Sequence, residues 1–174
     1  MTKLRSNLLL RIAGLAAGLV LAASLLLSWR VAPSDGRLGA DVRLVSLVPG
    51  ELTTAPKGFF LSARSMQPGA APKIGRLRVR NIAPGTAAVS VKALPSDRTL
   101  ARVVQMQLSS GGRVMARGSI ERLRRPSAPM RIPLGKVRTL EAKVWIPRSV
   151  KRGYEARLAD VTLDLRVKVL KGRR

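Results

Sequence analysis

The sequence predicts an all-β protein, a jelly-roll-like antiparallel β-sandwich preceded by one N-terminal hydrophobic helix. Apolar and polar residues alternate in five separate segments, which is typical of strands with one buried and one wet face. Turn-forming residues separate the segments at intervals of about eight to twelve residues, as in β-sandwiches. The chain opens with an uncharged run, residues 12–29, that has no polar face. A length of 174 residues fits one domain with a short appendage.

The N-terminal run has the features of an export segment. Lys3, Arg5 and Arg11 come before or at the start of an apolar run of 18 residues that ends at Trp29. A membrane span needs about 20 residues, so this length fits a cleaved signal peptide and an uncleaved anchor equally. The basic start keeps the N-terminus in the cytoplasm and sends the rest across the membrane.

The same run sets the expected domain organisation. Residues 1–32 are expected to be a signal peptide or signal anchor, which contacts the membrane through residues 12–29 unless it is cleaved. Residues 33–40 are expected to be a juxtamembrane segment. Residues 41–174 are expected to form a β-sandwich outside the cytoplasm, either secreted or anchored at the cytoplasmic membrane.

Period-two alternation marks the strands of that domain. The clear cases are 76–81, 87–93, 104–108, 139–146 and 161–169, and the weaker ones are 42–48, 58–63, 113–117 and 130–134. Turn signals such as Pro68-Gly69, Pro84-Gly85 and Gly111-Gly112 lie between them. No window of twelve or more residues after position 40 has a convincing helical period. Asn81, at a strand end, is expected to be a turn residue.

Composition excludes most catalytic chemistry. The chain has no Cys and no His, so disulfides, thiolate nucleophiles and Ser/His or Cys/His pairs are excluded. The usual zinc ligands are missing for the same reason. Aromatic residues make up 3% of the chain, which supplies few side chains for stacking on bases. We expect a non-catalytic protein without cofactor or metal.

Carboxylates offer no better candidate for an enzyme. A glycosidase needs two carboxylates that face each other across a cleft. Asp160 and Asp164 share one face of the last strand but lie about 13 Å apart along it, which is too far. Asp164 is instead expected to pair with an Arg across the strand pair. A hydrolase is therefore the less favoured class.

Positive charge dominates the chain, and most of it lies on the expected exported domain. The net charge is +24, and residues 41–174 hold 28 Lys and Arg against 8 Asp and Glu, or +20. Such a field attracts polyanions over about 8–10 Å at physiological salt. The candidate binding residues form three local clusters: Arg76, Arg78 and Arg80; Arg122, Arg124 and Arg125; and Arg148, Lys151 and Arg152. The alternative is an ordinary solvated surface.

Sequence-specific binding of nucleic acid is the obvious rival explanation for this charge. The chain has no helix-turn-helix or zinc-finger pattern, and stacking aromatics are scarce. The export segment also takes the domain away from the chromosome. The expected partners are therefore anionic envelope or matrix polymers rather than a specific DNA sequence.

A series of short motifs, in order, resembles the TasA/camelysin-like family of exported bacterial β-sandwich proteins. A Pro-Gly at 68–69 precedes a strand that ends in Asn81, and Asp97 and Leu100 follow. Further matches are the Gly-Ser-Ile at 118–120, the Leu-Gly at 134–135, the Val-Trp-Ile-Pro at 144–147 and the Gly-Tyr at 153–154. Together they span about 60–170.

The resemblance implies a jelly-roll-like sandwich at the cell surface or in the extracellular matrix, where some members of the family polymerise into biofilm fibres. Two departures limit it. The motif that usually follows the signal is only vaguely echoed in residues 33–48. The protease activity described for some members does not carry over, because a chain without His has no HExxH zinc helix.

The expected function is thus structural: a surface or matrix protein with a basic face for anionic polymers. Assembly into a homo-polymer would use an exposed edge strand, with residues 42–48 as the segment donated to a neighbour. The alternative is a monomeric, membrane-anchored, adhesin-like binding module.

Overall fold

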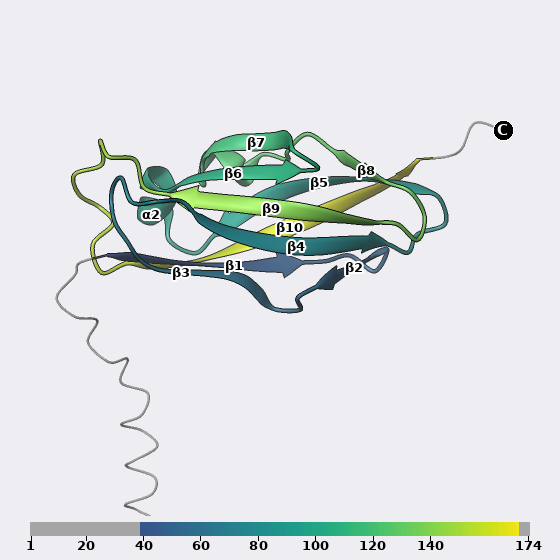
Figure 1. Ribbon diagram of the computed structural model, residues 1–174, viewed down its shortest axis with the longest axis horizontal. Coiled ribbons are helices and arrows are strands. Elements are labelled where there is room, and N and C mark those ends of the chain that lie inside the picture. Colours follow the sequence, from purple (N-terminus) through teal and green to yellow (C-terminus); the bar gives the residue numbers. More distant parts are fainter. Residues whose placement is uncertain (1–38, 171–174) are drawn as a thin grey trace, which may run out of the picture. The chain divides into compact units, whose positions relative to one another are not determined.

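The computed structural model describes residues 39–170, and within this range ten strands form two five-stranded sheets (Figure 1). Sheet I has the order β3-β1-β10-β5-β8 and sheet II the order β2-β4-β9-β6-β7. The strands of sheet I are β3 (Phe59–Met66), β1 (Ala40–Leu47), β10 (Leu158–Leu170), β5 (Thr86–Pro95) and β8 (Met130–Ile132). Those of sheet II are β2 (Leu52–Ala55), β4 (Lys73–Asn81), β9 (Val137–Trp145), β6 (Gln105–Ser110) and β7 (Arg113–Ser119). The prediction of an all-β protein built as a sandwich of two sheets is confirmed.

The core lies between the two sheets and is built by the alternation seen in the sequence. In β4, Gly75, Leu77 and Val79 are buried while the residues between them are exposed. In β10, alternate residues from Ala159 to Leu165 are buried in the same way. Successive side chains of a strand point to opposite faces, so each sheet contributes one apolar face to the core. All nine candidate strands overlap strands of the structure, with bounds that shift by a few residues.

Sheet I is not purely antiparallel, which corrects the prediction. β1 runs parallel to β10 over seven residue pairs, from Asp41 opposite Leu158 to Leu47 opposite Asp164. All other strand pairs in the two sheets are antiparallel. The parallel pair joins the first and last strands of the described range, and nothing in the alternation of either strand specifies its direction.

The same pairing places residues 42–48 away from any sheet edge. Most of this segment forms β1, which lies between β3 and β10 and is hydrogen-bonded to both. Val42 and Leu44 are fully buried in the core. The sheet edges are formed by β3 and β8 in sheet I and by β2 and β7 in sheet II. In the single chain, residues 42–48 therefore offer no exposed edge, and their donation to a neighbour stays a prediction.

Two short helices lie outside the sheets in the part of the chain that the structure describes. The α-helix α2 (Arg98–Val103) connects β5 to β6, and the 3-10 helix η1 (Arg122–Arg124) follows β7. Asp97 caps α2, because its Oδ1 accepts a hydrogen bond of 2.7 Å from the backbone N–H of Leu100. A helix of six residues is too short to produce a clear helical period in the sequence.

Asn81 is a turn residue, as the sequence predicted, because its side chain bonds the backbone two residues on, and it is also a buried connector. Its Nδ2 donates to the carbonyls of Gly85 (2.7 Å) and Ile132 (2.8 Å), and its Oδ1 accepts from the backbone N–H of Ala83 (2.8 Å). Its side chain is fully buried. Asn81 thereby joins the β4–β5 turn to β8, which belongs to the opposite sheet.

Three predictions lie outside the described residues: the hydrophobic N-terminal helix, the export segment at residues 1–32, and the contact with the membrane through residues 12–29. Most of the predicted juxtamembrane segment, residues 33–40, also lies outside them. Within residues 39–170, no helix is long and apolar enough to cross a membrane.

Candidate functional site

The first basic cluster forms a row on the outer face of β4. Arg76, Arg78 and Arg80 are exposed, and they alternate with the buried Leu77 and Val79. Residues two apart on a strand lie about 6.6 Å apart along it, so the three guanidinium groups follow one line across sheet II. The alternation predicted this placement from the sequence, and the structure bears it out.

Arg76 differs from the other two because it has an acidic neighbour. Its Nε donates to Oε2 of Glu141, directly across the strand pair on β9, at 3.1 Å. Lys143 lies 3.5 Å from the other oxygen of the same carboxylate. The hydrogen bond from Arg76 and the charge of Lys143 lower the pKa of Glu141. One carboxylate thus neutralises part of the charge at this end of the row.

Arg78 and Arg80 form no ion pair with any residue in the range 39–170. On β9 they lie opposite Thr139 and Val137, and on β2 they lie opposite Ala55 and Thr53. None of these four neighbours is charged. Both guanidinium groups therefore keep their five donors available for a ligand.

Sequence reasoning missed a further cation on the same face. The guanidinium of Arg117, on β7, lies 5.7 Å from the ring centre of Trp145 on β9. Trp145 is half-buried on the polar side of its strand. A cation over an indole face is attracted by the ring, which holds Arg117 on the outer surface of sheet II. The pairing of β7 with β6 and of β6 with β9 brings these two residues together, and no spacing in the sequence specifies it.

The outer face of sheet I has a different charge pattern, because three of its cations are paired with carboxylates. Arg43 donates to both oxygens of Asp160, at 2.6 and 2.8 Å. Asp164 lies 3.6 Å from Lys92 on β5 and 3.3 Å from Arg166 on its own strand. The cross-strand partner of Asp164 is thus Lys92, not the Arg that the sequence predicted. The two faces of the sandwich differ in their surplus of positive charge.

The second cluster lies on and after η1. Arg122, Arg124 and Arg125 are all exposed, and Arg124 donates to Oε1 of Glu121 at 3.1 Å. The Oε2 atom of Glu121 is buried and has no hydrogen-bond partner among the described residues. Backbone bonding attaches this segment to α2, because the N–H of Glu121 donates to the carbonyl of Ala101 at 2.9 Å.

The third cluster lies in the loop between β9 and β10. Arg148, Lys151 and Arg152 are exposed there. Arg148 packs over Gly69, since a Cβ added to that glycine would clash with Cγ of Arg148. The loop also borders α2, because a Cβ on Gly153 would lie 3.8 Å from Cγ2 of Thr99. The segments that carry the second and third clusters thus both border α2, whereas the first cluster lies on the face of a strand.

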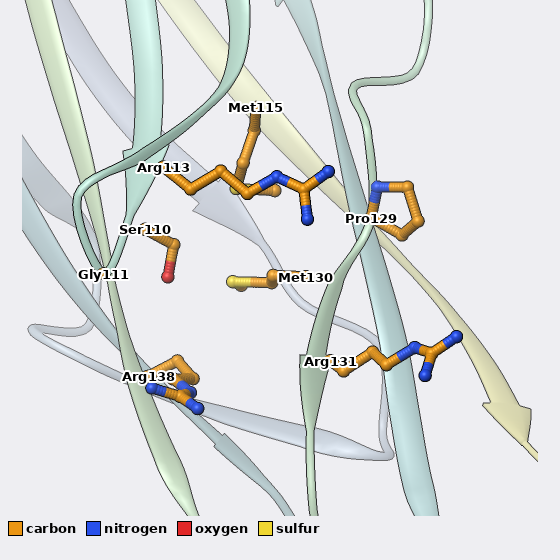
Figure 2. Close-up of a pocket in the computed structure, with 8 residues that line it drawn as sticks. All are labelled: Ser110, Gly111, Arg113, Met115, Pro129, Met130, Arg131 and Arg138. Atoms are coloured by element: carbon orange, nitrogen blue, oxygen red, sulfur yellow. The ribbon is translucent and has the colours of Figure 1, made fainter.

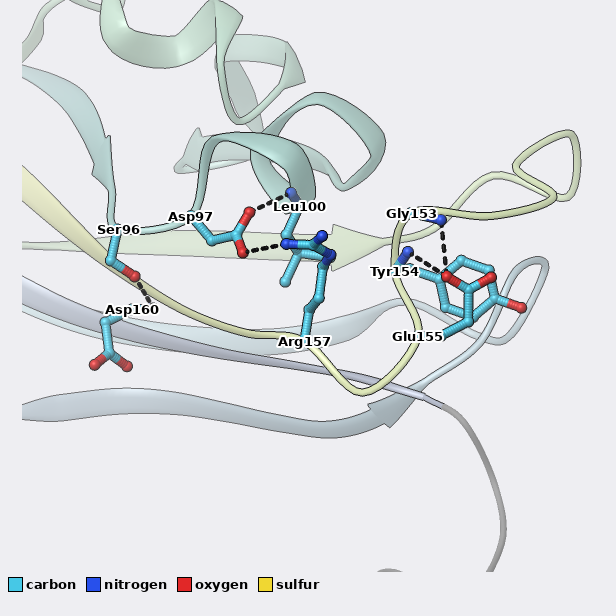
Figure 3. A network of polar contacts seen from close by, with 8 residues as sticks. All are labelled: Ser96, Asp97, Leu100, Gly153, Tyr154, Glu155, Arg157 and Asp160. Carbon is cyan, nitrogen blue, oxygen red and sulfur yellow. Dashed lines mark hydrogen bonds and ion pairs between the residues drawn. The ribbon is translucent and has the colours of Figure 1, made fainter.

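A polar network fixes the loop near α2 (Figure 3). The free oxygen of Asp97 accepts from Arg157 at 2.9 Å, and Glu155 accepts backbone N–H groups of Gly153 (2.8 Å) and Tyr154 (3.0 Å). The hydrogen bond from Leu100, and then that from Arg157, lower the pKa of Asp97. Backbone N–H groups, first that of Glu155 itself, lower the pKa of Glu155.

The carboxylates of the described range are engaged in such contacts rather than facing one another. Seven of the eight accept a hydrogen bond or form an ion pair: Asp41, Asp97, Glu121, Glu141, Glu155, Asp160 and Asp164. No group of three or more acidic residues within residues 39–170 is arranged to hold a metal ion.

Comparisons with known proteins assign the chain to no family. No protein-family model matches the chain, and no curated protein matches it either. The candidate site therefore depends on its own geometry: a row of exposed guanidinium groups on the outer face of sheet II, two of which form no ion pair within the described range.

Proposed function

We propose that the protein is a non-catalytic component of the cell surface or extracellular matrix, exported from the cytoplasm, that binds anionic polymers on the outer face of sheet II. The binding surface consists of Arg76, Arg78, Arg80, Arg117 and Lys143. The N-terminal basic and apolar run supports export, and the surplus of cations over carboxylates on sheet II supports the binding. The clusters at η1 and in the β9–β10 loop extend the positive field around α2.

The observation that carries this proposal is the contrast between the two outer faces. Surface cations without a function are commonly interspersed with carboxylates, as they are on sheet I. Arg78 and Arg80 lie directly opposite uncharged residues on both sides and form no ion pair within the described range, so a polyanion does not have to displace a bound carboxylate. The guanidinium fork also matches the geometry of phosphate, sulfate and carboxylate oxygens.

The salt dependence of binding tests the proposal. A labelled DNA duplex of about 20 base pairs serves as a polyanion probe, and the full chain is held in zwitterionic bilayer discs. Each phosphate neutralised on B-DNA contributes about 0.9 to the slope of log K against log salt. Binding should therefore weaken steeply with salt, and Arg78→Gln together with Arg80→Gln should reduce the slope by about 2.

The matched control removes the same charge from the other sheet. Arg64 and Lys168 are exposed residues of β3 and β10 that form no ion pair within the described range. Arg64→Gln with Lys168→Gln should leave the slope within about half a unit. Equal slopes for the two double variants would show that only net charge matters and would overturn the assignment to sheet II.

Assembly is the second part of the proposed function. The resemblance to the TasA/camelysin-like family supports a jelly-roll-like sandwich that polymerises through an edge strand. The position of β1 inside sheet I favours the other reading, a monomeric membrane-anchored binding module, because donating residues 42–48 would remove Val42 and Leu44 from the core. Sedimentation of the bilayer-disc sample should give one chain per disc, and a concentration-dependent polymer would overturn this reading.

A further inference from the structure

We propose that a cleft at the β7–β8 side of the sandwich binds a small amphipathic anion, an apolar chain with a single phosphate or carboxylate head. The cleft has a volume of about 620 Å³ and opens between the edge strand of sheet II and the edge strand of sheet I. Ligand pockets in proteins commonly measure about 300–1,000 Å³. This site is separate from the outer face of sheet II and does not depend on the function proposed for that face.

Two guanidinium groups reach the cleft from the inner side of sheet II. Arg113 begins β7, where it pairs with Ser110 across a two-residue hairpin turn. Gly111 and Gly112 form this turn with φ of 56° and 79°, a conformation that favours glycine at both positions. Arg138 lies on β9 in phase with the buried Leu140, Ala142 and Val144, so its side chain starts on the core side of the sheet.

The position of Arg138 follows from the lengths of the strands. The pairing of β6 with β9 ends at Ser110 opposite Leu140, so Arg138 lies beyond the last residue of β6. Arg113 and Arg138 are exposed, and neither forms an ion pair with a residue of the described range. No carboxylate lines the cleft. An anionic head therefore meets cations without an internal competitor.

The floor of the cleft is apolar. Met115 from β7 and Met130 from β8 are each 8% exposed, and both line the cleft together with Pro129. Figure 2 shows the side chain of Met130 directed toward Ser110, with Arg113 extending across the gap toward Pro129. Methionine side chains are flexible and polarizable, which suits them to contact an alkyl chain of variable shape.

The segment before β8 closes one side of the cleft and argues against a peptide strand as the occupant. The N–H of Ser127 donates to the carbonyl of Val91 in sheet I at 2.8 Å, and the N–H of Ala128 donates to the carbonyl of Met115 in sheet II at 3.1 Å. The edge of β7 is thus already covered at Met115. An added strand needs a run of free backbone groups, and β8 offers only three residues.

Methyl resonances of the methionines report on this cleft directly. The chain has five methionines, of which Met115 and Met130 line the cleft while Met66 and Met106 are buried elsewhere in the core. The full chain, labelled with ¹³C at the methionine methyl groups and held in zwitterionic bilayer discs, is titrated with octyl phosphate and with octanoate. Met115→Leu and Met130→Leu assign the two signals.

We expect the Met115 and Met130 signals to shift in a saturable manner while the Met66 and Met106 signals stay in place. Octyl phosphate and octanoate distinguish the two kinds of head group, and saturation by either one supports the site. Arg113→Gln with Arg138→Gln should weaken binding at least about tenfold, since two charge-assisted hydrogen-bonding groups are lost. Arg64→Gln with Lys168→Gln, which removes the same charge from the other sheet, should change it less than about twofold.

Three results would overturn the proposal. Equal shifts at all four methionines would indicate general partitioning into the core. Saturation by inorganic phosphate at the same concentration would reduce the site to a simple anion site, and saturation by octanol would remove the role of the guanidinium groups. Unchanged Met66 and Met106 signals in the double variant confirm that it remains folded.

Discussion

Asn81 joins parts of the chain that lie far apart in sequence. Its amide side chain bonds the turn after β4 and the carbonyl of Ile132, and its backbone bonds Lys136 (3.1 Å) and Gly135 (2.9 Å) in the turn between β8 and β9. One buried residue thus holds the β4–β5 and β8–β9 connections together through its side chain and its backbone. A buried amide with its donors and acceptor satisfied fixes one arrangement, because any other leaves polar groups without partners.

Replacing Asn81 with Ala should lower the free energy of unfolding by about 3 kcal/mol, since buried carbonyl and N–H groups lose their partners. Chemical denaturation at pH 7 measures this change. Asn81→Asp should also destabilise the fold at pH 7, because its carboxylate faces two carbonyl oxygens. The folded state would raise the pKa of that carboxyl, so the Asp variant should regain stability as the pH falls. A loss below 1 kcal/mol in Asn81→Ala would contradict the role assigned here.

Asp97 makes a stability contribution that depends on pH. The folded state lowers the pKa of this carboxyl through the N–H of Leu100 and the guanidinium of Arg157. A group whose pKa is lowered on folding stabilises the protein above its unfolded pKa of about 3.9, and the contribution is lost as the pH falls through the folded value. The effect is therefore present at neutral pH.

We expect Asp97→Ala to lose about 1 kcal/mol of stability at pH 7, the usual cost of removing a helix N-cap. The difference from the unmodified protein should shrink below about pH 4, where the carboxyl becomes protonated. Asp97→Asn keeps a cap acceptor and should lose less. Thermal unfolding followed by circular dichroism from pH 2 to 7 measures all three proteins, and a difference that stays constant with pH would contradict the assignment.

The sequence predicts the place of exposed strand residues well but not their partners. Arg78 and Arg80 alternate with apolar residues, so their exposure follows from the period of a strand. Arg138 could have been assigned to the inner face, because it is in phase with Leu140. The contact of Arg117 with Trp145 could not, since β6 lies between their strands and strand order is set by tertiary packing.

At the level of elements, the close approach of β3 to β4 connects one edge of sheet I to sheet II. A Cβ added to Gly75 would lie 2.7 Å from Cβ of Leu61 and 3.0 Å from the carbonyl oxygen of Phe60. Such distances leave no room for a methyl group. Gly75 therefore sets how closely the two sheets pack beside β3.

Gly75→Ala should lower the free energy of unfolding by about 1–3 kcal/mol, because β3 must move away from β4. Gly50→Ala is the matched control: its Cβ would meet nothing within 4 Å, and its φ does not lie in the left-handed region. The control should be neutral or slightly stabilising, by up to about 1 kcal/mol. Denaturant titrations compare the two, and equal effects would remove the case for close packing at Gly75.

Strands were predictable from the sequence where apolar and polar residues alternate, and they were harder to predict where the strand is short. All five clear candidates became strands of six to thirteen residues. β2 was missed because it has four residues and a single buried side chain, Leu52. The helix α2 was missed for a similar reason, since its six residues cover fewer than two turns.

At the scale of the whole molecule, charge separates by face. Residues 39–170 carry 25 Lys and Arg against 8 Asp and Glu. The acids of the described strands lie mostly on the outer face of sheet I, which leaves sheet II with the larger surplus of cations. The composition predicts a surplus of cations, but the pairing of strands decides which outer face of the sandwich carries that surplus.

The parallel pairing of β1 with β10 also determines how the sandwich resists being pulled apart. β1 begins with Ala40 at one end of the sandwich, and β10 ends with Leu170 at the other (Figure 1). Tension between these two points loads the evenly spaced hydrogen bonds of the parallel pair in shear, so they share the force and do not open one after another. In a tethered surface protein of the kind proposed, β1 and β10 would act as a mechanical clamp against the drag of an attached polymer.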